Sequence, residues 1–251
     1  MRSVLGLAVL IISAAGGLAQ ERAKPAAAPK KAALTAEQVI DKSIEAAGGR
    51  AAMEKLVSTY AKGMMEFTEQ DMYGLLELYA KAPNKQLIVM NLDMVGEVKQ
   101  AFDGKVAWAR EPSGRIVEVS GAPLEDARRR AVFNAPLRWR ELYPKAELTG
   151  EDSVGDRKAY VIRLTAATGQ FVTRYYDQET FLLLREAGNH DTPQGAMDVQ
   201  ADFSDYRDVD GVKTPFRITQ TLPAGELVLK ISEVKNNLEI DDAKFRKPAD
   251  K

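Results

Sequence analysis

The spacing of apolar residues changes once along the chain, near Ser58, from about every 3.6 residues to every second residue. The second period continues almost to the C-terminus, with one interruption near 121–143, and is typical of strands that bury one face. It is clearest where Met197, Val199, Ala201 and Phe203 alternate with polar residues. The pattern predicts strands at 59–68, 74–83, 86–93, 96–102, 105–110, 115–119, 147–152, 158–166, 170–177, 181–187, 197–206, 214–222 and 226–235.

Short turns connect these predicted strands. Asp103-Gly104, Asp210-Gly211 and Ala224-Gly225 stand where a hairpin needs residues that tolerate a positive φ. Short connections favour antiparallel pairing of strands that are neighbours in the chain, so the sheet should be a meander. A sheet of this size does not stay flat, and it should curl into an incomplete barrel whose inner face needs a cover.

Part of that cover should come from a helical region at 35–57. Thr35 and Gln38 form a capping-box pattern that opens a helix, and Gly48-Gly49 ends it. A second short helix is expected over 51–57, where apolar residues lie on one side.

An insertion near 121–143 interrupts the strands and supplies the rest of the cover. Ser120 and Pro123 open a helix there, and Asn134-Ala-Pro136 breaks it. The predicted fold class is therefore α+β, mainly antiparallel β: a curved half-barrel meander, with helices of 35–57 and 122–143 covering the concave face.

The first residues match a secretory signal, because Arg2 precedes an apolar run from Val4 to Ala15 and small residues follow. The run is 12 residues long, whereas a bilayer-spanning helix needs about 20. We therefore expect residues 1–19 to be a signal peptide cleaved near Ala19, and 20–34 to be a flexible Ala/Pro/Lys linker. Residues 35–251 should form one domain in an exported, periplasmic protein.

Composition removes several classes of function. With 35 Lys+Arg against 36 Asp+Glu, a net charge of −1 gives no reason to bind nucleic acid. The chain has no Cys and one His, so neither a metal site nor a cofactor is predicted. His190, beside Asp191, is expected to be an exposed loop residue, and no G-x-S-x-G nucleophile motif is present. We therefore expect a protein that is not an enzyme.

The predicted half-barrel leaves an apolar space between the sheet and the helices. Burying an acyl chain gains about 0.8 kcal/mol per methylene, so a 16-carbon chain would supply about 12 kcal/mol before costs. Met64, Met65, Met72, Met90 and Met94 could fill or vacate such a space, although ordinary core packing is the alternative for each. The candidate lining residues, which could equally be plain core, are Phe67, Leu87, Val89, Phe102, Trp108, Phe133, Leu137, Trp139, Phe171, Phe203, Phe216 and Ile218.

Basic side chains gather in the predicted insertion, at Arg128 to Arg130, Arg138 and Arg140. They would give it a positive face that could meet anionic lipid head groups or an acidic receptor surface. A solvated helix face is the alternative.

Four phrases carry a resemblance to a known family: GEDSVGDRKAYVIRL at 150–164, YYDQETFLLLRE at 175–186, DYRDVDGVKTPFRI at 205–218 and IDDAKFRKP at 240–248. Together with the N-terminal helix, they resemble the outer-membrane lipoprotein-sorting (LolA-like) periplasmic carriers. The resemblance implies a curved antiparallel sheet with a helical lid. Relatives with this fold include lipoprotein carriers, envelope-stress sensors and glycolipid-binding proteins, so the fold does not select the cargo.

The leading prediction is a periplasmic carrier that holds the acyl chains of a lipoprotein or lipid in an apolar cavity, for transport across the envelope. Its partners would be that cargo and membrane-bound donor and acceptor proteins. The alternative is an envelope sensor or adaptor domain of the same fold that binds a protein partner.

Overall fold

A computed structural model describes residues 34–192 and 195–249. The predicted signal peptide and all of the predicted linker except Leu34 lie outside these residues. Within them, no helix is both long and apolar enough to cross a membrane.

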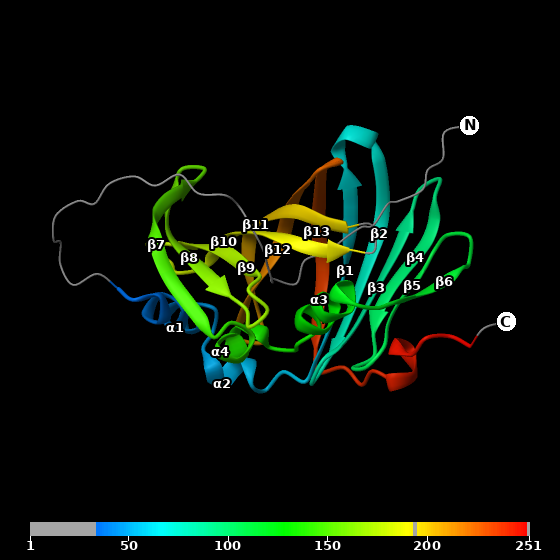
Figure 1. Cartoon of the computed structure of the whole chain (residues 1–251), viewed down its shortest axis with the longest axis horizontal. Helices are drawn as coiled ribbons and strands as arrows, with labels where there is room; N and C mark the ends of the chain where they lie inside the picture. The colour runs from blue at the N-terminus through cyan, green and yellow to red at the C-terminus, as the bar shows by residue number, and fades with distance from the viewer. Residues whose placement is uncertain (1–33, 193–194, 250–251) are drawn as a thin grey trace.

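The described residues form one 13-stranded antiparallel sheet, which curves into an open trough (Figure 1). This confirms the predicted half-barrel, mainly β with a few helices. The strands are β1 Ser58–Phe67, β2 Met72–Lys81, β3 Lys85–Leu92, β4 Gly96–Phe102, β5 Ala107–Arg110, β6 Ile116–Val119, β7 Lys145–Val154, β8 Arg157–Thr165, β9 Phe171–Asp177, β10 Leu183–Thr192, β11 Gly195–Val209, β12 Val212–Leu222 and β13 Gly225–Asn236.

The strand order departs from a simple meander at one place. The order is β6-β5-β4-β3-β2-β1-β13-β12-β11-β10-β9-β8-β7, so β1 pairs with β13, and β6 and β7 form the two edges. The register of the β1–β13 pair runs from Thr59 opposite Asn236 to Phe67 opposite Leu227. The helical insertion between β6 and β7 carries the chain from one edge to the other, and therefore these two strands do not pair as neighbours.

The N-terminal helix α1 (Ala36–Ala46) has the predicted capping box, since Thr35 Oγ1 accepts the N–H of Gln38 at 3.2 Å. Helix α2 (Arg50–Met53) is shorter than the predicted 51–57. The Asn134 side chain donates to the carbonyl of Met53 at 2.7 Å and so satisfies a group at the end of that helix. The chain then turns directly into β1.

The insertion consists of α3 (Ala122–Arg130), a 3-10 turn η2 (Ala135–Arg138) and α4 (Trp139–Leu142). Figure 1 shows α3 inside the curve of the sheet, and α1, α2 and α4 grouped near β7 and β9. Two further 3-10 turns are η1 (Thr68–Gln70) and η3 (Asp242–Phe245). The four α-helices of the described residues therefore lie on the concave side, as predicted.

Strand β10 continues to Thr192, whereas the sequence predicted its end at residue 187. The prediction of an exposed loop for His190 is therefore wrong: His190 lies in β10 opposite Met197 and is 1% exposed. Gly, Asn and Asp are poor strand formers, but cross-strand pairing with β11 outweighs that local preference.

The two faces of the sheet have separate cores. On β3, Ile88 and Met90 belong to a concave cluster of strand residues, whereas Leu87 and Val89 belong to a convex cluster that includes Ile240 and Phe245. Successive side chains of a strand point to opposite faces, so the two clusters lie on opposite sides of β3. The C-terminal segment thus covers part of the convex face.

Candidate functional site

The middle of the concave face is an apolar surface built from strand residues. One cluster joins β1, β2, β3 and β13, with Met65, Met90, Leu227 and Leu229 each at 0% exposure. A second lies on β11, around Phe203. The half-buried residues Ile218 and Leu222 pack against both clusters and make them continuous. We call this surface, formed by the two clusters and these two residues, the apolar trough.

Helices pack mainly against other parts of the sheet. Among the described residues, α1 and α4 contribute to a cluster over β8 and β9, and α3 packs against β5 and β10. The two clusters of the apolar trough contain, by contrast, only strand side chains within the described part of the chain. The trough is therefore a continuous apolar cluster of strand side chains, with its central members closed to solvent, and it lies between the part of the sheet under α1 and α4 and the part under α3.

Three of the five methionines predicted to adapt to a ligand lie in or against the trough. Met65 and Met90 are fully buried in it, and Met72 packs at its margin. Met64 and Met94 are different, because they are 52% and 106% exposed. The trough therefore contains flexible, polarizable side chains in its interior.

A polar group borders the trough on the same face. The cross-strand row that starts with Phe67 and Leu227 continues through Gln220 and Ala201 to Glu186, whose neighbour on β9 is Arg174. Facing neighbours in such a row point to the same side of the sheet. The concave face is therefore mainly apolar along β1–β3 and β11–β13, with Gln220 buried among the apolar residues, and it is charged at β9 and β10.

Arg174 and Glu186 form a buried ion pair, with Nε 2.6 Å from Oε2 and side chains 6% and 1% exposed. Burial by itself would lower the pKa of Arg174, but the Glu186 carboxylate raises it overall. Tyr143 of the insertion lies over this pair, its ring centre 5.7 Å from the guanidinium carbon, and burial raises the pKa of its phenol. Among the described residues, Tyr143 Oη and Glu186 Oε1 are buried without a hydrogen-bond partner.

A second polar cluster fastens α3 to the sheet. Asp126, 1% exposed, lies 2.6 Å from Arg129, 2.8 Å from Arg130 and 3.3 Å from the Nδ1 of His190. Burial acts to raise the pKa of Asp126, but the hydrogen bond with His190 and the two arginines lower it overall. Arg129 also donates to Gln170 at 3.0 Å, so α3 is tied to the sheet by two polar contacts.

The contacts of this cluster indicate the role of His190. His190 pairs with Asp126, from 64 residues away, whereas Asp191 accepts a hydrogen bond from Gln170. Both members of the His190–Asp126 pair are 1% exposed, so the pair holds α3 in place and does not reach a substrate from solvent. Within the described ranges, no group of three or more His, Cys, Asp or Glu side chains has the geometry of a metal site.

The predicted lining residues are divided between the two faces. On the concave face, Phe67, Phe203 and Ile218 lie in the trough, Phe102 lies beneath α3, and Leu137 and Trp139 lie with α1. Phe216 is on the same phase of β12 as Ile218, and the Arg207 guanidinium lies 4.3 Å from its ring. Phe133 is half-buried, and its N–H donates to the Pro83 carbonyl at 2.9 Å.

Four predicted residues lie on the convex face, so no single cavity contains all twelve. Leu87, Val89 and Trp108 pack beneath the C-terminal segment, and the Trp108 indole donates to the Phe245 carbonyl at 2.9 Å. Phe171 is one position out of phase with the inward-facing Val172, and it packs against Arg163. The convex-side cover over Leu87, Val89 and Trp108 explains why these outward-facing residues are apolar, and strand periodicity alone does not reveal it.

The predicted positive face of the insertion is largely neutralised. Arg129 and Arg130 are buried against Asp126, so they are not a solvated face. Arg128 pairs with Glu125, and Arg138 with Glu141. Arg140 pairs with Asp41 of α1 at 3.2 Å.

Sequence reasoning missed the charged residues of the concave face. A signal was available for Arg174 and Glu186, because each occupies the inward phase of its strand: Arg174 lies between Val172 and Tyr176, which are both buried. A charged residue on the inward phase indicates a buried pair or a polar site. Asp126 gave no such signal, since α3 is polar on most of its surface.

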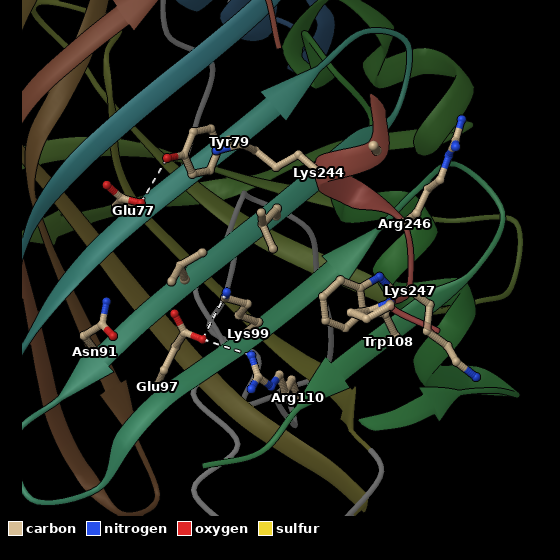
Figure 2. Close-up of a pocket in the computed structure, with 14 residues that line it drawn as sticks. Glu77, Tyr79, Asn91, Glu97, Lys99, Trp108, Arg110, Lys244, Arg246 and Lys247 are labelled. Carbon is tan, nitrogen blue, oxygen red and sulfur yellow. Dashed lines mark hydrogen bonds and ion pairs between the residues drawn. The ribbon is translucent and has the colours of Figure 1, made fainter. Parts of the chain in front are cut away.

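The convex face carries a groove of about 480 Å³ between strands β2–β5 and the C-terminal segment (Figure 2). Leu87, Val89 and Trp108 form part of its floor. Its polar residues are Glu77, Tyr79, Asn91, Glu97, Lys99, Arg110, Lys244, Arg246 and Lys247.

Comparisons with known proteins identify the fold. No family model matches the sequence, and no curated protein matches it. Among solved structures, the chain is similar to a LolA superfamily protein from Nitrosomonas europaea, at 18% identity and a TM-score of 0.56 over 86% of this chain and 99% of that one.

Two further structures have comparable similarity. One is a DUF1329 family protein from Desulfovibrio piger, at 15% identity and a TM-score of 0.57, covering 84% of this chain and 97% of that one. The other is a putative outer membrane lipoprotein-sorting protein domain from Vibrio parahaemolyticus, at 12% identity and a TM-score of 0.57, with the same coverage. With its open 13-stranded sheet and concave-side helices, the chain has a LolA-like fold.

Proposed function

We propose that the protein is a periplasmic carrier that binds the acyl chains of a lipid or lipoprotein along the apolar trough. The observation that carries this proposal is the continuous apolar area across six strands, β1–β3 and β11–β13, between the two helical covers. The name of one structurally similar protein, a lipoprotein-sorting domain, agrees with such a cargo. The proposal includes export, which the N-terminal sequence predicts.

The polar group at β9 and β10 suits the head of such a ligand. Tyr143 Oη is a buried hydroxyl with no partner among the described residues, and it lies beside the Arg174–Glu186 pair. An ester or amide carbonyl at the end of an acyl chain would accept a hydrogen bond from it. Tyr143→Phe removes this hydroxyl alone, so we expect a stable protein that binds acylated ligands more weakly.

The test compares two substitutions on one strand. Leu78 is half-buried and packs against the trough, whereas Leu75 lies on the opposite face of β2 and is 59% exposed. Leu78→Asn should weaken binding of a fluorescent fatty acid at least tenfold, and Leu75→Asn should leave the affinity unchanged. Equal affinity for both variants and the unchanged protein would contradict the proposal.

A second function, an adaptor that binds a protein partner, is favoured by an exposed apolar patch. Met64 and Leu75 are cross-strand neighbours, and they are 52% and 59% exposed. Tyr73, on the same strand phase as Leu75, is 39% exposed. Contiguous exposed apolar residues mark many interaction surfaces. If this function holds instead, Leu75→Asn will abolish capture of one stoichiometric protein partner, and Leu78→Asn will not.

A further inference from the structure

We propose that the groove on the convex face is a second binding site, which takes a small anionic amphiphile: a carboxylate or phosphate head on a short apolar body. The groove lies on the opposite side of β3 from the apolar trough, because Leu87 and Val89 line it while Ile88 and Met90 face the trough. The inference is therefore independent of the function proposed for the concave face.

One wall of the groove is held firmly against the sheet. Phe245 is fully buried among residues that include Leu87 and Trp108, and the Trp108 indole donates to its carbonyl at 2.9 Å. Nearby, Lys81 donates to the Ile240 carbonyl at 2.7 Å and to Asp242 at 2.8 Å. The site is thus formed before a ligand arrives, which reduces the ordering cost of binding.

The charges that face the groove favour an anion. Glu97 is already paired with both Lys99, at 3.0 Å, and Arg110, at 3.3 Å. The other carboxylate, Glu77, accepts hydrogen bonds of 3.0 Å from the hydroxyls of Tyr60 and Tyr79. Both acids are therefore occupied by donors within the protein.

The cations exceed these acids in number. Lys99, Arg110 and Lys244 face the groove, and Figure 2 shows Lys244 reaching over the Tyr79 ring, with Nζ 3.8 Å from its centre. Arg246 lies farther out on the same wall, and Lys247 pairs with Glu118 of β6, with its Nζ 2.9 Å from Oε1. A local positive excess in a chain of net charge −1 is complementary to one acidic group.

Size and lining determine the rest of the ligand. A volume of about 480 Å³ falls within the usual range for small-molecule sites, about 300–1,000 Å³. Leu87, Val89 and the methylene stems of the lysines offer an apolar floor beside the cations. A compact head with a short alkyl or aromatic body fits both features.

The test uses octanoate and octyl phosphate as probes. Octanol is the counterpart without a charged head, and inorganic phosphate is the counterpart without an alkyl chain. Binding is followed residue by residue by NMR, so that signals of the Trp108 indole and Lys244 report the groove and methyl signals of Met90 report the trough. We expect either anionic probe, or both, to shift the groove signals, and the tighter of the two identifies the head. Octanol and inorganic phosphate should bind there at least tenfold more weakly.

Two variants complete the test. Lys244 is exposed, so Lys244→Gln should leave the fold intact and weaken binding in the groove roughly three- to fivefold. Lys158→Gln, at an exposed position on β8, is the control and should change nothing. The proposal is overturned if neither anionic probe shifts the groove signals, if octanol or inorganic phosphate binds as tightly, or if the two variants behave alike. Chemical-shift changes confined to Met90 would overturn the proposal of a site in the groove and would support the proposed acyl site in the trough.

Discussion

Replacing Glu186 with Gln tests whether the concave face contains an obligatory buried ion pair. Its partner Arg174 is 6% exposed, so the substitution leaves a guanidinium charge in the interior without its carboxylate. Removing one member of a buried pair costs about 3–5 kcal/mol. A Gln side chain can still accept one hydrogen bond from Arg174, so the lower end, about 3 kcal/mol, is expected.

The measurement is urea denaturation followed by circular dichroism. With a slope of about 3 kcal/mol per molar, reasonable for a chain of this length, the midpoint should fall by about 1 M. Glu141→Gln is the matched control, because Glu141 pairs with Arg138 on the surface, where the side chains are 63% and 46% exposed. The urea midpoint of Glu141→Gln should equal that of the unchanged protein. The reasoning would be refuted if the urea midpoint of Glu186→Gln lay within about 0.2 M of the midpoint of the unchanged protein, a difference on the order of the assay error.

Three other predictions follow from single contacts. Phe245→Ala should cost about 3–5 kcal/mol in unfolding free energy and expose the Trp108 indole to solvent quenchers, because Phe245 is fully buried in the convex core; an unchanged quenching curve would count against this. Hydrogen bonds from Lys81 and Lys85 lower the pKa of Asp242 to about 2. The Asp242 carboxylate should therefore stabilise the fold fully above about pH 4, and this stabilisation should be lost as the pH falls through about 2. An NMR titration in which the Asp242 carboxyl has an ordinary midpoint would disprove this prediction. Gly48→Ala should destabilise the protein strongly, because Gly48 has φ +119° and a Cβ there would overlap the Gly211 carbonyl. Gly155→Ala, in open space at φ +61°, should lower the free energy of unfolding by only about 1 kcal/mol. Equal decreases in melting temperature for the two variants would contradict this prediction.

Strand periodicity predicted much of the sheet, because one buried face imposes alternation on each strand. It was least informative for β3, whose residues Leu87, Ile88, Val89 and Met90 are all apolar and buried. A strand covered on both sides shows no alternation, so the sequence could not say which pair faces the trough. The second cover is the C-terminal segment around Phe245, whose docking is a tertiary contact.

The parts that sequence reasoning missed depend on pairings between distant residues. The β1–β13 pair joins strands from opposite ends of the domain, and no local signal specifies that junction. The same holds for His190, whose partner Asp126 lies 64 residues away. Near its own position the chain reads Gly-Asn-His-Asp, a turn-like composition, and the alignment of β10 with β11 overrides it.

The most direct test of the central claim is NMR with a long-chain fatty acid methyl ester, an acyl ligand without the charged head that the groove is proposed to bind. Consecutive residues of β3 face opposite sides of the sheet, so one strand supplies both the test and its control. The account predicts that the methyl groups of Ile88 and Met90 show intermolecular nuclear Overhauser effects to the acyl chain at stoichiometric ligand, while those of Leu87 and Val89 show none. Absence of these effects at Ile88 and Met90 under conditions where the ester is bound would contradict an acyl site in the trough.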